Sequence, residues 1–236
     1  MALPKVNEVL KFNLTIPSTG QNVRYRPYLV KEEKVLLQAF ESKDEVACIN
    51  AMCDTLESCI DPADNIVVSQ LATFDLEYMF LKVRSKSVGE TSDILISCKD
   101  CNKQNDYAVD LELVDIQVND NDYIVEITDA IKVEMKYPSY SAVISGDGID
   151  TNSVDGALDL IAGCISAVHT EEERLDCNNI DKSEVLEFLG SMTASQLKGI
   201  SSFVENMPAL QHDIAFKCSK CGSDNELTLK GLTDFF

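Results

Sequence analysis

The spacing of apolar residues divides the chain into segments with a helical period and segments with the two-residue period of strands. A hairpin is predicted within residues 6–28, where alternating apolar residues flank a turn at 17–20. Helical spacing predicts two helices between residues 29 and 59. Thr73 can cap a third helix at about 74–85, which is too apolar for a solvated surface. We expect this helix to be the core of an N-terminal helical unit.

Beyond this unit the period changes twice. Between residues 93 and 135, alternating apolar residues form four runs, at 94–96, 107–111, 123–127 and 131–135, which predict a set of short strands. Residues 145–152 form a Gly/Asp-rich linker, and three helices with recognisable starts are predicted after it. The capping residues are Ser153 for the first, Asp181 with Glu184 for the second, and Thr193 with Gln196 for the third. Strands are predicted again from residue 213 to the end.

These elements predict an α+β protein, with N-terminal and central helical units around a split four-cysteine β element that resembles a zinc ribbon. We expect residues 1–90 to form an N-terminal hairpin and helical unit. Residues 91–138 and 213–236 are predicted to form the split β domain. Residues 139–212 are predicted to be an acidic helical insertion.

The chain is strongly acidic, with 20 Lys and Arg against 40 Asp and Glu and a formal net charge of −20. This charge repels phosphate backbones and anionic lipid headgroups, so neither nucleic acid nor membranes are expected as partners. No apolar run has the length of a membrane span, and the first residues lack the pattern of a signal peptide. We therefore expect a soluble protein that is not exported.

Charge is distributed unevenly along the chain. Residues 1–40 contain six basic and three acidic side chains, a net charge of +3, whereas residues 141–190 contain two basic and eleven acidic ones, a net charge of −9. The acidic segment is the better candidate for docking a basic partner. A solvated face that maintains solubility is the alternative, with equal weight.

Two C-x-x-C motifs carry the clearest chemical signal. Their cysteines are Cys98, Cys101, Cys218 and Cys221. A C-x-x-C turn directs both sulfurs toward one point, so two such turns complete a tetrahedral thiolate site for a structural Zn²⁺. The flanking residues also repeat at an offset of 120: Asp93, Ile94 and Asn105 correspond to Asp213, Ile214 and Asn225. We predict two strand-knuckle-strand hairpins that together make a zinc ribbon, divided by a long insertion.

Other roles for these cysteines are weaker. A redox dithiol normally opens a helix, whereas both pairs lie between predicted strands. Iron in a rubredoxin-like site uses the same ligand set, and the sequence does not distinguish iron from zinc. The other cysteines have no partner spacing and are predicted to be buried small hydrophobes. These are Cys48, Cys53, Cys59, Cys164 and Cys177.

No catalytic site can be assembled from the remaining residues, so we expect a protein that is not an enzyme. The two histidines, His169 and His212, lie outside metallohydrolase and nucleophile motifs, and His169 is expected to follow a helix end. A closed four-thiolate site has no open coordination position and organises the fold without doing chemistry. Residues 171–173 are predicted to be a solvated helix start. The basic patch Lys82, Arg84 and Lys86 is too small to bind nucleic acid.

Four further segments are distinctive enough to compare with known families. They are LTIPSTG at 14–20, RYRPYLVKEEK at 24–34, FDLEYMFLKVRSKSVG at 74–89 and GLTDFF at 231–236. Together with the two knuckles, these segments resemble the baseplate hub assembly proteins of T4-like bacteriophages. The resemblance implies a non-enzymatic protein needed to build the central hub of the baseplate, either as a chaperone that leaves or as a minor hub component. It also implies partners among the other hub proteins or the tape-measure protein.

The resemblance places the protein in the host cytoplasm during assembly, or in the tail baseplate of the virion. The competing function is a zinc-ribbon module for nucleic-acid binding or transcription. A nucleic-acid reader is expected to cluster Lys and Arg around its ribbon. The knuckles have few lysines, and these are interspersed with aspartates: Lys99, Lys103, Lys217 and Lys220 among Asp100, Asp106, Asp213 and Asp224. This pattern favours the assembly role.

Overall fold

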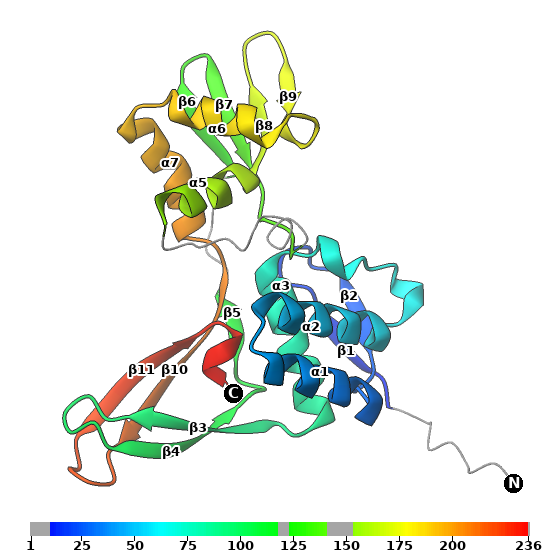
Figure 1. Ribbon diagram of the computed structural model, residues 1–236, viewed down its shortest axis with the longest axis vertical. Coiled ribbons are helices and arrows are strands. Elements are labelled where there is room, and N and C mark those ends of the chain that lie inside the picture. The colour runs from blue at the N-terminus through cyan, green and yellow to red at the C-terminus, as the bar shows by residue number, and fades with distance from the viewer. Residues whose placement is uncertain (1–9, 118–122, 141–152, 236) are drawn as a thin grey trace, which may run out of the picture. The chain divides into compact units, whose positions relative to one another are not determined.

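The computed structural model describes residues 10–117, 123–140 and 153–235, so the linker expected at 145–152 lies outside the described residues (Figure 1). The chain is a mixture of helices and several small sheets, as the sequence predicts. Contacts divide it into two compact units. Unit 1 comprises Met1–Val68, Phe74–Gln117 and Ala209–Phe236, and unit 2 comprises Ser69–Thr73 and Val118–Pro208. The three-part domain division stays a prediction.

Unit 1 begins with the predicted hairpin. Strands β1 (Phe12–Thr15) and β2 (Asn22–Tyr25) are antiparallel, with Phe12 opposite Tyr25. Gly20 turns the chain between them with φ of +69°, a conformation that favours glycine. The segment after the second helix joins the other side of β2, because Tyr25 and Ile60 form a bridge.

Three helices follow in unit 1 at the predicted places: α1 (Val30–Ser42), α2 (Glu45–Cys59) and α3 (Thr73–Ser87). Two short 3₁₀ turns, η1 (Pro62–Asp64) and η2 (Val68–Gln70), precede α3. The Asp44 side chain caps α2 by accepting a hydrogen bond from the Ala47 amide at 3.1 Å. The apolar residues of α3 are buried, as predicted for a core helix: Phe74, Leu76, Met79, Phe80, Leu81 and Val83.

Two antiparallel hairpins complete unit 1. Strands β3 (Thr91–Ser97) and β4 (Gln104–Asp110) form one, and β10 (Ala209–Lys217) and β11 (Asp224–Lys230) form the other. The short strand β5 (Asp115–Gln117), which the sequence pattern did not predict, pairs with β10. The chain ends in the 3₁₀ turn η4 (Leu232–Phe235), where the Phe235 side chain is fully buried.

The α3 residues predicted as a basic patch instead contact protein groups within unit 1. Lys82 Nζ donates hydrogen bonds to the carbonyl oxygens of Leu111, Glu112 and Val114 at 3.1, 3.0 and 3.0 Å. Lys86 pairs with Glu90 at 2.6 Å and with Glu112 at 3.4 Å. These lysines therefore fix the segment between β4 and β5 to the core helix.

Unit 2 is a four-stranded antiparallel sheet packed against helices. Its strands, in sheet order, are β6 (Ile124–Thr128), β7 (Ile131–Met135), β8 (Ile165–His169) and β9 (Arg174–Asp176). Its helical elements are α5 (Val154–Gly163), η3 (Cys177–Asn179), α6 (Lys182–Gly190) and α7 (Ala194–Glu205). Sheet residues such as Val133 and Ile165 share one apolar core with Leu189 of α6 and Phe203 of α7.

The three predicted helix starts in unit 2 are confirmed, and in two of them the predicted residue also makes a side-chain capping hydrogen bond. The Ser153 hydroxyl accepts from the Gly156 amide at 3.0 Å. Thr193 and Gln196 form a capping box. Asp181 precedes α6 as predicted, but its side chain makes no capping hydrogen bond.

The acidic segment is not wholly helical, which corrects the sequence prediction. Strands β8 and β9 follow α5, and His169 lies within β8 instead of following a helix end. Residues 171–173 are exposed in the turn between these strands and do not begin a helix. The apolar run Ile165–Val168 is too short for its period to distinguish a buried strand from a helix segment.

A carboxylate on β7 predicts a measurable acid sensitivity. Hydrogen bonds from Arg174 and His169, at 3.0 and 2.8 Å, lower the pKa of Glu134 to about 2. A lowered carboxyl pKa contributes stability above the unfolded value and loses it as pH falls through the folded value. We expect Glu134→Gln to lower the melting temperature at pH 7, and this difference from the unmodified chain should shrink between about pH 4.5 and pH 2. Thermal unfolding followed by circular dichroism measures it, and a difference that is independent of pH would contradict the assignment.

Candidate metal centre

The two C-x-x-C motifs lie in the turns of the two unit 1 hairpins. Cys98 and Cys101 are in the turn between β3 and β4, and Cys218 and Cys221 are in the turn between β10 and β11. All four sulfur atoms lie within 4.8 Å of one another. Across the hairpins, Cys98 Sγ lies 3.7 Å from Cys221 Sγ and Cys101 Sγ lies 3.6 Å from Cys218 Sγ. The fold thus brings together all four predicted residues.

This spacing fits a tetrahedral metal site. Thiolate ligands bind zinc at about 2.3 Å, which places two sulfurs of a tetrahedron about 3.8 Å apart. The cross-hairpin distances of 3.6 and 3.7 Å are close to that value. Four thiolates are a soft donor set suited to zinc or iron and unsuited to magnesium or calcium. The cluster can therefore bind a metal ion.

Local backbone hydrogen bonds shape each knuckle in the same way. The Cys98 amide donates to the Lys103 carbonyl, and the Cys218 amide donates to the Ser223 carbonyl, both at 2.9 Å. The residue after each motif is left-handed, with φ of +54° at Asn102 and +72° at Gly222. Asparagine and glycine tolerate this conformation better than other residues. Each motif therefore carries the information for its own turn.

Two buried asparagines support the knuckles, and sequence reasoning assigned them no role. Asn105 and Asn225 are only 7% and 4% exposed. The Asn105 amide nitrogen lies 3.8 Å from Cys218 Sγ, and that of Asn225 lies 3.6 Å from Cys98 Sγ. The matching offset of 120 was the available signal, because it placed both asparagines at equivalent positions behind their motifs.

Backbone amides favour negative charge on part of the cluster. The N–H groups of Cys221 and Lys220 lower the pKa of Cys218 to about 6. At Cys98, desolvation is outweighed by the N–H groups of Cys101 and Asp100, and its pKa is also lowered. The Ser223 amide favours the Cys221 thiolate, but the adjoining sulfurs raise the pKa of Cys221 to about 12. Four sulfurs this close ionise together only around a cation.

The remaining cysteines match the predicted structural role in part. Cys53, Cys59 and Cys164 are buried, and burial raises their pKa values to about 12, 11 and 12. Cys48 and Cys177 are only partly buried. Among the described residues, no other group of three or more His, Cys, Asp or Glu side chains is close enough to hold a metal ion.

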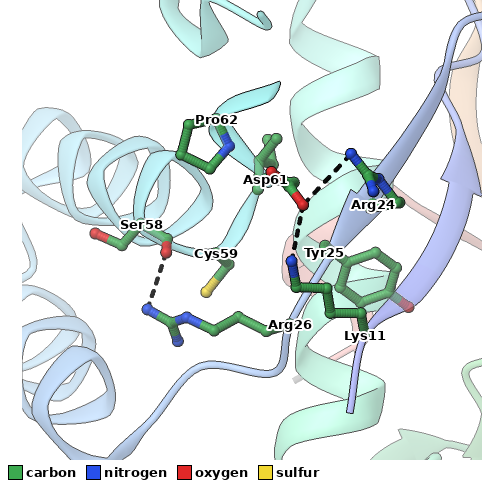
Figure 2. A pocket seen from close by; sticks show the side chains of 9 residues that line it. Lys11, Arg24, Tyr25, Arg26, Ser58, Cys59, Asp61 and Pro62 are labelled. Atoms are coloured by element: carbon green, nitrogen blue, oxygen red, sulfur yellow. Dashed lines mark hydrogen bonds and ion pairs between the residues drawn. The ribbon is translucent and has the colours of Figure 1, made fainter. Parts of the chain in front are cut away.

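A pocket of about 200 Å³ lies between the N-terminal hairpin and the end of α2 (Figure 2). Asp61 lies between two of its cations, 2.8 Å from Lys11 Nζ and 3.5 Å from Arg24 Nη2. Arg26 Nη2 donates to the Ser58 carbonyl at 2.9 Å and to Glu32 at 3.0 Å. Because all three cations are already paired, the pocket connects the hairpin to α2 and offers little attraction to an external anion.

Comparison with known proteins identifies the family. Residues 9–236 match the family model described as T4 bacteriophage base plate protein. The chain belongs to this family. The resemblance found in the sequence is thereby confirmed at the level of the baseplate, and this baseplate protein is expected to contact other phage baseplate proteins. Searches of curated proteins and of solved structures found no match. None of the helices in the described ranges combines the length and hydropathy of a membrane span.

Proposed function

We propose that this baseplate protein is a non-enzymatic tail protein required to assemble the central hub of the baseplate. It acts through protein–protein contacts, either as an assembly chaperone or as a minor hub component. The match to the baseplate family over residues 9–236 carries this proposal. It acts in the host cytoplasm during assembly. The two roles differ in the fate of the protein, because a minor hub component stays in the tail of the virion and a chaperone leaves.

We further propose that the four cysteines bind one structural Zn²⁺. The ligands are Cys98, Cys101, Cys218 and Cys221. When bound, the ion supplies charge neutralisation and a coordinated link between the hairpins, with no open position for catalysis. The two C-x-x-C turns hold the ligands in place. The bound metal joins the β3–β4 hairpin to the β10–β11 hairpin, which are far apart in the sequence.

The proposed partner is a basic surface on another hub protein or on the tape-measure protein. Residues 141–190 have a net charge of −9, and the exposed turn at 171–173 belongs to this segment. The nucleic-acid alternative is disfavoured because the exposed positions on β3 and β4 include Asp93, Asp106 and Asp110. Electrostatic complementarity of this kind sets association rate and specificity more than final affinity.

Infection with a phage that no longer encodes this protein tests the proposal. We expect particles without it to lack a complete central hub, and expression of the intact chain in the host to restore assembly. A tagged copy captured from infected cells should retain hub or tape-measure proteins identified by mass spectrometry. Assembly of normal hubs without the protein would refute the proposed function. Mass spectrometry of purified virions then distinguishes a retained component from a chaperone.

The acidic turn gives a separate prediction. Changing Glu171, Glu172 and Glu173 together to glutamine should slow association with the captured hub partner, with a larger effect at low salt than at high salt. The matched control changes Asp93, Asp106 and Asp110 to asparagine, which removes the same charge from another exposed surface. Equal association rates for both triple variants at every salt concentration would show that residues 171–173 are only a solvated turn.

A further inference from the structure

The two hairpins hold each other's metal-binding turns through one asparagine each. Asn105 is on β4, but its Oδ1 accepts hydrogen bonds from the Ser219 amide and hydroxyl, at 2.9 and 2.8 Å, in the opposite knuckle. Its amide nitrogen also faces Cys218 Sγ at 3.8 Å. One side chain thus contacts both the backbone and a sulfur of the other hairpin.

Asn225 on β11 makes the equivalent contacts in the opposite direction. Its Oδ1 accepts from the Lys99 amide at 3.0 Å, and its amide nitrogen faces Cys98 Sγ at 3.6 Å. Each asparagine is also held by its own turn, through the Lys103 carbonyl at 2.9 Å for Asn105 and the Ser223 carbonyl at 3.0 Å for Asn225. The two sets of contacts are therefore related by exchange of the hairpins.

We propose that Asn105 and Asn225 are reciprocal positioning residues for the metal centre, each orienting the C-x-x-C turn of the opposite hairpin. This inference rests on the proposed Zn²⁺ site and assigns it two residues beyond its ligands. It also couples the two turns, since each hairpin supplies a hydrogen-bond acceptor to a backbone amide in the turn of the other. The asparagines do not touch the metal themselves.

Asparagine suits this position because its side chain is both an acceptor and a donor. The oxygen accepts a hydrogen bond from a knuckle amide, and the nitrogen donates toward a sulfur that carries negative charge as a ligand. Four thiolates around a divalent ion leave excess negative charge, and outer partners that donate hydrogen bonds stabilise it. Aspartate keeps the acceptor but replaces the donor with a second negative charge. Alanine loses both.

Metal titrations of the purified full chain test the inference. Four single variants are compared: Asn105→Ala, Asn225→Ala, Asn105→Asp and Asn225→Asp. The two aspartate variants keep the side-chain shape and the acceptor oxygen. Asn179→Ala, at an exposed asparagine of unit 2, is the control. Competition with a chelator is expected to show 10- to 100-fold weaker Zn²⁺ binding for the Asn105 and Asn225 variants. Bound Co²⁺ should show a thiolate charge-transfer band at lower energy, because the sulfur loses a hydrogen-bond donor.

Alkylation of the zinc-loaded protein, mapped by mass spectrometry, separates positioning from general destabilisation. Asn225→Ala should raise the alkylation rate of Cys98 and Cys101 over the unmodified chain more than that of Cys218 and Cys221. Asn105→Ala should produce the reverse. A variant that only destabilises the fold would raise all four rates together. If an alanine variant loses its circular dichroism spectrum, the corresponding aspartate variant supplies the decisive measurement.

The outcomes separate this inference from the metal site itself. Unchanged affinity, Co²⁺ spectrum and alkylation pattern in the asparagine variants would overturn the positioning role while the metal site stands. If both alanine variants raised the alkylation rate of the same cysteine pair, the claim that each asparagine orients the opposite turn would be overturned. An unmodified chain that takes up neither Zn²⁺ nor Co²⁺ would overturn the metal site, and this inference with it.

Discussion

Replacing Cys218 with serine is expected to abolish tight metal binding and to lower the melting temperature of unit 1. The unmodified chain should contain about one equivalent of zinc by elemental analysis after purification under reducing conditions without chelator. Structural zinc sites bind with apparent free energies of about 10–16 kcal/mol, and this binding is coupled to folding. Loss of one of four ligands therefore has the largest expected effect on this protein. Calorimetry with and without chelator measures the change in melting temperature.

Helix content should survive this change to a large extent. The core of unit 2 contains none of the four cluster cysteines, so its helices do not depend on the site. Cys177→Ser is the matched control, because Cys177 is partly buried and lies outside the cluster. It should retain one equivalent of zinc. An unchanged melting temperature in Cys218→Ser, or a metal-free unmodified chain, would contradict the assignment.

Replacing Lys82 with methionine is expected to destabilise unit 1 by about 3 kcal/mol, because hydrogen bonds from a charged group contribute about 1.5–3 kcal/mol and three carbonyl groups lose their donor. Burial lowers the pKa of Lys82, although Glu112 and Asp115 oppose this shift. Methionine keeps most of the apolar stem of lysine, so the change isolates the ammonium group. Urea unfolding followed by circular dichroism gives the free energy.

Lys34→Met supplies the control for this second change. Lys34 is exposed on α1, and the same substitution there should alter the free energy of unfolding by less than about 0.5 kcal/mol. Equal effects of the two substitutions would show that the contacts of Lys82 with the 111–114 segment contribute nothing to stability. A larger loss for Lys82→Met would confirm that α3 anchors the segment leading to β5.

Short-range interactions explain which elements could be predicted. Caps such as Ser153 and Thr193 bond to amides three residues away, and hairpins such as β1 and β2 close over a few residues. The sequence pattern of a few residues therefore contains most of the interaction. Elements stabilised by distant partners escaped prediction: β5 exists through pairing with β10, and β8 through its place between β7 and β9.

The lysines of α3 illustrate the same limit for side chains. As a sequence pattern, Lys82, Arg84 and Lys86 indicate a small basic surface. Lys82 instead bonds to carbonyl groups about thirty residues further along the chain, and Lys86 pairs with Glu112. A long flexible side chain can reach either solvent or protein, and only the packing around it decides which.

Local sequence features were enough to predict the four cysteines, the two knuckles and the family, because the C-x-x-C spacing and the quoted motifs each lie within a short stretch of chain. Only the tertiary structure placed Cys98 3.7 Å from Cys221 and gave Asn105 and Asn225 their opposite knuckles. Contacts across about 120 residues depend on strand pairing and core packing throughout unit 1. No local pattern contains that free energy, so the ligands were predictable, whereas the offset of 120 marked the two asparagines without showing that each one contacts the opposite knuckle.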